Sequence, residues 1–188
     1  MKKLFFNKAL RILLSTNAMI LMAGAMLGPI YALFVEKIGG DLMDASIAGS
    51  IFALVAGLTT LISGKYSDKV KENELIVVLG YSIMGLGFLS YFFVNSVILL
   101  FMVQVIIGIG EAIYSPAFDA VYSKHLDGHK SGLQWGAWES MNYFTTALGA
   151  LIGGLLVTIF SFQILFIIMG LLCFSSALYI YLLERKVL

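Results

Sequence analysis

Six long apolar runs, separated by short polar segments, limit what this chain can fold into. They cover approximately residues 12–35, 46–63, 75–94, 97–122, 133–159 and 162–183. A helix of about 20 apolar residues crosses the roughly 30 Å hydrocarbon core of a bilayer. The runs are continuous instead of alternating, which favours helices over the strands of a β-barrel. We therefore predict an all-α membrane protein in which residues 1–188 form a single bundle of six transmembrane helices.

The composition supports a membrane protein and argues against several other classes. Of the 188 residues, 60% are hydrophobic and 12% are charged, whereas soluble domains are typically about 45–50% apolar and about 25% charged. The net charge of +1 gives no reason to expect a nucleic-acid partner. Cys173 is the only cysteine, and His125 and His129 share one polar loop without further candidate ligands. We predict no metal site, no cofactor and, because no nucleophile–base set is visible, no enzymatic activity.

The first apolar run follows a basic segment, as the apolar region of a secretory signal peptide does. Small residues at 23–25 could also imitate a cleavage site. The run continues, however, over 24 residues from Ile12 to Val35, which is long enough to span a bilayer. We therefore favour an uncleaved first transmembrane helix. The cations that precede it are Lys2, Lys3, Lys8 and Arg11.

Positive charge is unevenly distributed between the two sides of the predicted bundle. With the N-terminus inside, the inner segments are 1–11, 64–74, 123–132 and 184–188, and they hold 11 of the 12 Lys and Arg residues. Only Lys37 lies on the outer side. Cytoplasmic loops carry such an excess of cations. We predict that the protein lies in the inner membrane with both termini in the cytoplasm.

A charged turn, GKYSDKVK at residues 64–71, follows the second apolar run. We expect Gly64 to let the backbone turn closely or pack against a neighbouring helix, and Asp68 to cap a helix N-terminus or pair with a cation. The stretch resembles the signature loop between helices 2 and 3 of the major facilitator superfamily, a family of membrane transporters. Gly64, Asp68, Lys69 and Lys71 carry the likeness, which is incomplete over residues 70–72. An ordinary charged loop that follows the positive-inside bias is the alternative interpretation.

Two glycine patterns add to this resemblance. Members of the superfamily often have an arginine followed by glycines in helix 4, and antiporters have a Gly-Pro-x-x-Gly-Gly motif in helix 5. Here Gln104 takes the place of the arginine and Ala150 that of the proline. The helix-5 pattern suggests export by proton exchange. Close helix packing is the role expected for Gly108, Gly110, Gly149, Gly153 and Gly154, and for a small-residue seam of Gly49, Ala53 and Gly57.

The only two prolines suggest an internal symmetry. Pro29 lies late in the first run, which would lead outward, and Pro116 lies late in the fourth run, which would lead inward. An inverted repeat of helices 1–3 onto helices 4–6 places equivalent residues toward opposite faces in this way. The pattern agrees with the resemblance, because each half of some major facilitator proteins consists of two inverted three-helix repeats.

Two carboxylates lie within predicted transmembrane helices. Glu111 is near the middle of 97–122, and Glu139 lies about two turns into 133–159. A charge at mid-bilayer costs about 2.5–3.5 kcal/mol on insertion scales, and no Lys or Arg lies deep in a predicted helix to neutralise either acid. Each acid could accept a proton or contact a cation in a transport cavity, or it could bridge two helices as a protonated acid. We regard Glu111 as the leading candidate for substrate or proton coupling.

Polar residues and glycines follow one face of the predicted helices around these acids. In helix 97–122 they recur at positions 104, 108, 111, 115 and 119, and helix 133–159 carries a similar stripe. Such a stripe indicates a face that points into a bundle or a cavity. The residues expected to assist Glu111 are Glu139, Asn17, Gln104 and Asn142.

The resemblance extends over the whole chain but covers only the N-terminal six-helix half of the superfamily's fold. It implies that helices 1 and 4 line a substrate cavity, that helices 2 and 5 flank a second half, and that helices 3 and 6 face lipid. The protein would transport a small solute by alternating access, with the second six-helix half supplied by a homodimer or by a separate chain. An inner gate would use Gly64, Asp68, Lys69, Lys71 and Asp119. The alternative is a truncated or non-transport membrane protein that serves as a packing or regulatory partner.

Overall fold

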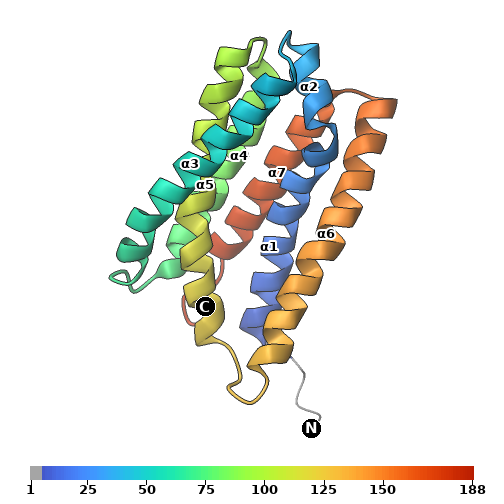
Figure 1. Ribbon diagram of the computed structural model, residues 1–188. Coiled ribbons are helices and arrows are strands. Elements are labelled where there is room, and N and C mark those ends of the chain that lie inside the picture. Colours follow the sequence, from blue (N-terminus) through green and yellow to red (C-terminus); the bar gives the residue numbers. More distant parts are fainter. Residues whose placement is uncertain (1–5) are drawn as a thin grey trace.

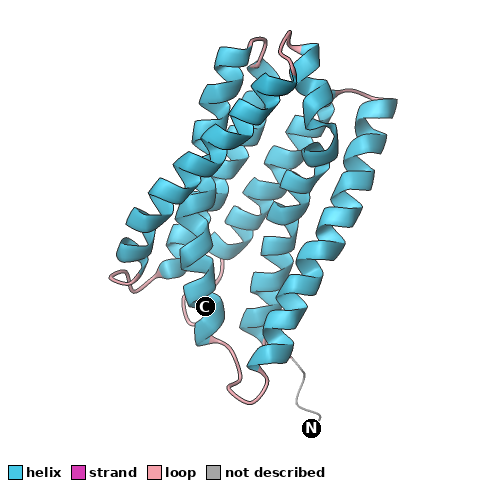
Figure 2. Ribbon diagram, in the orientation of Figure 1, coloured by secondary structure: helices cyan, strands magenta, loops and turns pink. Residues whose placement is uncertain are grey.

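The computed structural model describes residues 6–188, and this part of the chain is helical throughout, without strands (Figure 2). The cations Lys2 and Lys3 lie outside the described residues. The α-helices are α1 (Lys8–Leu27), α2 (Tyr31–Lys37), α3 (Leu42–Ser67), α4 (Asn73–Ser90), α5 (Val97–Lys124), α6 (Ser131–Ile159) and α7 (Phe162–Tyr181), and the 3₁₀ helices are η1 (Gly28–Ile30) and η2 (Tyr91–Phe93). Within residues 6–188, six spans are long and apolar enough to cross a membrane, which confirms the predicted all-α class.

The first span is interrupted where a continuous helix was predicted. It runs over Lys8–Lys37, but the 3₁₀ turn η1 separates α1 from α2. Pro29 lies in the first turn of η1. Because proline has no N–H and its ring clashes with the preceding turn, it breaks the regular α-helical ladder at this point. The span also extends beyond the predicted 12–35 at both ends.

The second span begins earlier and ends later than predicted. Its N-cap is Asp41, whose side chain accepts a hydrogen bond from the Asp44 N–H, while the Asp44 carboxylate accepts one from the Asp41 N–H. This capping box starts the helix four residues before the predicted span of 46–63. At the other end Gly64 is still helical, and Asp68 is the C-cap, so neither residue has the turn or N-cap geometry expected for it. The chain turns over residues 68–72 instead.

The long helices form two groups, α3 and α4 with α5, and α6 and α7 with α1 (Figure 1). Both α3 and α4 pack on α5, and both α6 and α7 pack on α1. The groups meet mainly where α4 contacts α7. Each group therefore combines helices from both halves of the sequence. The first span packs with the fifth and sixth spans, and the fourth span packs with the second and third. An inverted repeat of three helices predicts this exchange.

Close contacts at glycines join the helices of each group. A Cβ atom added at Gly108 would lie 2.9 Å from the Phe52 carbonyl oxygen of α3, and one at Gly149 would lie 2.9 Å from the Met22 carbonyl oxygen of α1. At Gly153 the added atom would overlap the Met26 backbone, and at Gly110 it would lie 2.9 Å from the Met84 backbone nitrogen of α4. Gly154, Gly49 and Gly57 were also expected to pack, but Cβ atoms added at these three glycines would meet open space.

The helices differ in how much of their surface the bundle buries. Large buried side chains such as Tyr81, Phe118 and Phe166 come from α4, α5 and α7 and form one core with the buried face of α1. On α3, in contrast, only Ala48 and Ser67 are buried. On α6 the buried residues are Gln134, Thr145, Gly149 and Gly153. The remaining surfaces of α3 and α6 are the largest helix faces that the described bundle leaves without a neighbour.

Two adjacent glycines on α6 allow a matched test of this packing. We expect Gly153→Ala to destabilise the protein by about 1–3 kcal/mol, the range for an overpacked interior, because the new methyl group meets the Met26 backbone. Gly154→Ala should leave stability unchanged or raise it by up to about 1 kcal/mol, because alanine suits a helix better than glycine. The measurement is the fraction of detergent-solubilised protein that stays monodisperse after heating. Equal melting curves for the two variants would contradict the contact.

Candidate functional site

A cavity of about 320 Å³, the central cavity, lies among α1, α3, α4, α5 and α7 and is open to the surface beside the exposed Gly24, Gly28 and Gly49. Its wall is mainly apolar and aromatic, with one carboxylate, one amide and no Lys or Arg. Cavities of this size and character are typical of small-molecule sites. The lining residues are Gly24, Leu27, Gly28, Tyr31, Gly49, Phe52, Met84, Phe88, Tyr91, Gln104, Ile107, Glu111 and Met169.

Two tyrosine hydroxyls hold the Gln104 amide in place. The Nε2 group of Gln104 donates to the Tyr31 hydroxyl at 2.6 Å and to the Tyr91 hydroxyl at 2.8 Å. Both amide hydrogens are therefore used, while the amide oxygen has no hydrogen-bond partner among residues 6–188. Gln104 is 6% exposed, so these two hydrogen bonds, the tyrosine clasp, fix a buried polar group in one orientation.

Glu111 lies two helical turns from Gln104 and also lines the cavity. The Tyr114 hydroxyl donates to Glu111 Oε1 at 3.1 Å. The Tyr114 ring in turn packs edge-on against the Tyr81 ring, with centroids 4.9 Å apart. The Tyr81 hydroxyl then donates to Asn17 Oδ1 at 3.3 Å. Through these contacts a chain of polar side chains leads from the cavity wall on α5 across α4 to α1.

The structure brings together some of the predicted site residues and not others. Gln104 and Glu111 share the cavity wall, and Asn17 lies behind it at 2% exposure. Glu139 and Asn142, both on α6, are absent from the lining. Glu139 is exposed on the surface of the isolated chain. The sequence alone did not separate these two sets, because both acids lie in apolar runs.

The residues predicted to form the inner gate lie at the ends of α3 and α5. Asp68, Lys69 and Lys71 are exposed around the turn after α3, and Asp119 is exposed in the last turns of α5. Within residues 6–188, Asp119 makes no ion pair with a lysine of that turn. A different contact joins the two helices nearby, since the Ser63 hydroxyl donates to the Ala112 carbonyl oxygen.

Several residues of the site were missed in the sequence analysis. The third helix, expected to face lipid, supplies Met84 and Phe88 to the wall, and α7 supplies Met169. The outward face of α4 does point away from the bundle, as at Leu79 and Leu86, but α4 and α7 also pack on each other behind the cavity. The tyrosines carried a usable signal, because a phenol inside a membrane helix needs a hydrogen-bond partner. No group of three or more potential metal ligands occurs among the described residues.

A family model described as Major Facilitator Superfamily matches residues 13–187. The chain belongs to this superfamily. Among curated proteins, this major facilitator chain is similar to the uncharacterized transporter YitZ of Bacillus subtilis, with 23% identity over 156 residues, or 83% of this chain. It is also 25% identical over 171 residues, or 88% of its length, to the multidrug resistance protein MdtG of Yersinia enterocolitica. A third similar protein is the uncharacterized transporter MJ1560 of Methanocaldococcus jannaschii, with 23% identity over 156 residues. Membership in this family places the chain among membrane transport proteins.

The relatives differ in length. The matched region covers 94% of YitZ but only 41% of MdtG and 40% of MJ1560. This chain therefore corresponds to less than half of the two longer transporters. Its six spans agree with one half of a major facilitator fold.

The tyrosine clasp around Gln104 predicts a specific loss of stability. Tyr91→Phe removes one acceptor and leaves a buried amide hydrogen unpaired, which should destabilise the protein by about 1–3 kcal/mol. Tyr143→Phe is the matched control, because Tyr143 is 73% exposed on α6. Thermal unfolding in detergent, followed by size-exclusion chromatography, measures both variants. If Tyr91→Phe and Tyr143→Phe unfold at the same temperature, the tyrosine clasp does not stabilise the protein.

Proposed function

We propose that this chain is one half of an alternating-access transporter for small solutes and that the central cavity is its share of the substrate site. The cavity carries the proposal, because it combines a clasped amide and a lone carboxylate with an otherwise apolar wall. Family membership supports transport as the activity. The proposed orientation places both termini on the cytoplasmic side of the inner membrane, in agreement with the cations at the ends of α1, α3, α5 and α7.

The chemistry of the cavity favours a lipophilic monovalent cation as the substrate. Aromatic rings and thioethers suit an apolar ligand body, and tyrosine and phenylalanine faces also attract a cation. Glu111 supplies the only carboxylate of the wall. The relative named multidrug resistance protein agrees with a ligand of this kind, although that name describes the relative alone.

Proton coupling follows from the position of Glu111. A single carboxylate in an apolar wall can hold a proton or a cationic substrate, but a proton on it removes the attraction for the cation. We assign supporting roles to Gln104 and Asn17, which lie around the cavity, and to Glu139 and Asn142 if a second half brings α6 to the solute. Gly64, Asp68, Lys69, Lys71 and Asp119 are proposed to gate the inner side.

Glu111→Gln tests this assignment on the purified chain in lipid nanodiscs. The wild-type protein should bind tetraphenylphosphonium, with affinity that falls as the pH is lowered because protonation removes the negative charge. The variant should bind roughly 10- to 100-fold more weakly and without pH dependence, the loss expected for one contact with a charged group. Isothermal titration calorimetry at two pH values measures both properties.

Glu36→Gln is the control, because this substitution removes the same charge at a position outside the cavity. Glu36 is exposed at the outer end of the first span. Unchanged binding and pH dependence in Glu111→Gln would refute the coupling role. If Glu111→Leu also keeps full stability, the alternative of a non-transport packing or regulatory partner is favoured instead.

The faces of α3 and α6 support the need for a second six-helix half. The small-residue seam of Gly49, Ala53 and Gly57 is exposed, and Cβ atoms added at the two glycines would meet open space within the described part of the chain. Small residues allow helices to approach closely in a bilayer. A second copy of this chain or a separate half-protein would find at this seam a surface that the bundle does not cover.

A tryptophan at the seam should block this association. In native mass spectrometry from nanodiscs, we expect the wild-type chain to form a dimer and Gly57→Trp to shift it to monomer by filling the open space beside α3. The matched control is Leu86→Trp on the outward face of α4, where leucine is 56% exposed. A wild-type monomer would rule out the homodimer, and a dimer that survives Gly57→Trp would rule out the α3 seam as the interface.

A further inference from the structure

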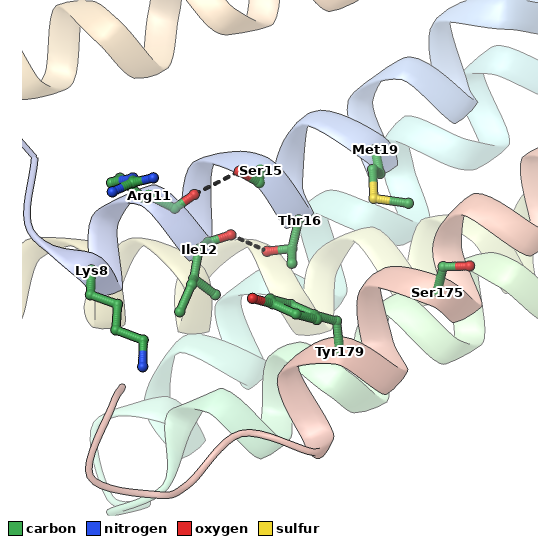
Figure 3. A pocket seen from close by; sticks show the side chains of 8 residues that line it. All are labelled: Lys8, Arg11, Ile12, Ser15, Thr16, Met19, Ser175 and Tyr179. Carbon is green, nitrogen blue, oxygen red and sulfur yellow. Dashed lines mark hydrogen bonds between the residues drawn. The ribbon is translucent and has the colours of Figure 1, made fainter.

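A second cavity lies between α1 and α7, away from the central cavity (Figure 3). Its volume is about 720 Å³. The walls combine two cations, Lys8 and Arg11, with hydroxyl groups and apolar side chains, and they contain no carboxylate. Nothing in the proposed transport mechanism uses this groove.

The groove opens on the lateral surface of the bundle, which would face lipid. On α1 it is lined by residues 8, 11, 12, 15, 16 and 19, and residues three or four positions apart in this set lie on the same helix face. Lys8, Arg11 and Ser15 are exposed on this face. The opposite face of α1 carries Leu13 and Asn17, which are buried in the bundle at 1% and 2% exposure. A ligand in the groove would therefore be reached from the surrounding bilayer and not from the transport cavity.

Charge and hydrogen bonding define the ligand. The Ser15 hydroxyl already donates to the Arg11 carbonyl at 2.8 Å, and the Thr16 hydroxyl donates to the Ile12 carbonyl at 3.0 Å. No acidic side chain within residues 6–188 forms an ion pair with Lys8 or Arg11. Positive charge is therefore concentrated at one end of the groove, where an arginine fork suits a phosphate group. Basic pockets between transmembrane helices on the cytoplasmic side bind the head groups of anionic lipids.

We propose that the groove between α1 and α7 is a binding site for an anionic phospholipid. The phosphate lies at Lys8 and Arg11, and one acyl chain follows the groove past Ile12 toward Met19 and Ser175. At 1.5 Å per residue, Lys8 and Met19 lie roughly 16 Å apart along α1, enough to hold a head group and the first part of a chain. Under the proposed orientation, this end of the bundle lies in the cytoplasmic leaflet.

Native mass spectrometry of the 188-residue chain, titrated with phosphatidylglycerol or phosphatidylcholine in detergent, tests the site. We expect one phosphatidylglycerol to bind in preference to phosphatidylcholine. The variant Lys8→Gln/Arg11→Gln should bind phosphatidylglycerol about 30-fold more weakly, the effect of two cations at a membrane surface. Lys65→Gln/Lys124→Gln removes the same charge from exposed positions outside the groove and should retain the affinity within a factor of about two.

A second variant tests the groove without changing its charge. Ser175→Phe places a ring in the acyl-chain path and should reduce lipid retention at least as strongly as the loss of the two cations. It also decides the question if the double variant fails to fold. The proposal is overturned if both charge variants lose affinity equally, if Ser175→Phe retains the lipid, or if water-soluble glycerophosphoglycerol displaces the lipid completely and so shows a simple anion site.

Discussion

The close approach of helix backbones at glycines is the constraint on which this bundle depends. Lipid tails are as apolar as the side chains of the helices, so helix association in a bilayer relies on van der Waals contact instead of the hydrophobic effect. Gly108 brings α5 against α3, while Gly149 and Gly153 bring α6 against α1. In both groups a helix with little buried surface packs at a glycine contact on a helix that lines the central cavity, and α3 itself also contributes to the wall. The positions of α1 and α5 in the wall are therefore fixed by contacts of the same kind.

This packing also determines where the polar groups of the cavity lie. Gly108 is one turn from Gln104 and three residues from Glu111, so fixing the backbone at Gly108 fixes the depth of both side chains. Tyrosine hydroxyls from α2, η2 and α5 then restrict the amide and the carboxylate. Polar groups held in this way lose little conformational entropy when a ligand binds. The site is rigid because its few polar atoms are tied to a closely packed backbone.

The sequence was sufficient to predict the spans but not the membership of the site. The length and hydropathy of each run are local properties, so the spans were found with shifts of a few residues at their ends. The site depends on contacts between helices, such as that of Gln104 with Tyr31, 73 positions away. Polar stripes describe one helix at a time, and they therefore ranked Glu139 and Asn142 beside Gln104 and Glu111. The apolar pattern of α4 likewise hid the face that carries Met84 and Phe88.

The helix α1 lies between the two cavities and limits how they can influence each other. Its buried face holds Asn17, which joins the polar chain that leads to Glu111, and its outer face carries Lys8 and Arg11. A lipid in the outer groove would contact α1 and α7 together, at a junction where the Ser176 hydroxyl already donates to the Thr16 carbonyl at 3.0 Å. A solute in the central cavity would instead contact α1 and α5, which touch each other only sparsely. The two ligands would stabilise different helix pairs, so any coupling between them requires a displacement of α1 itself.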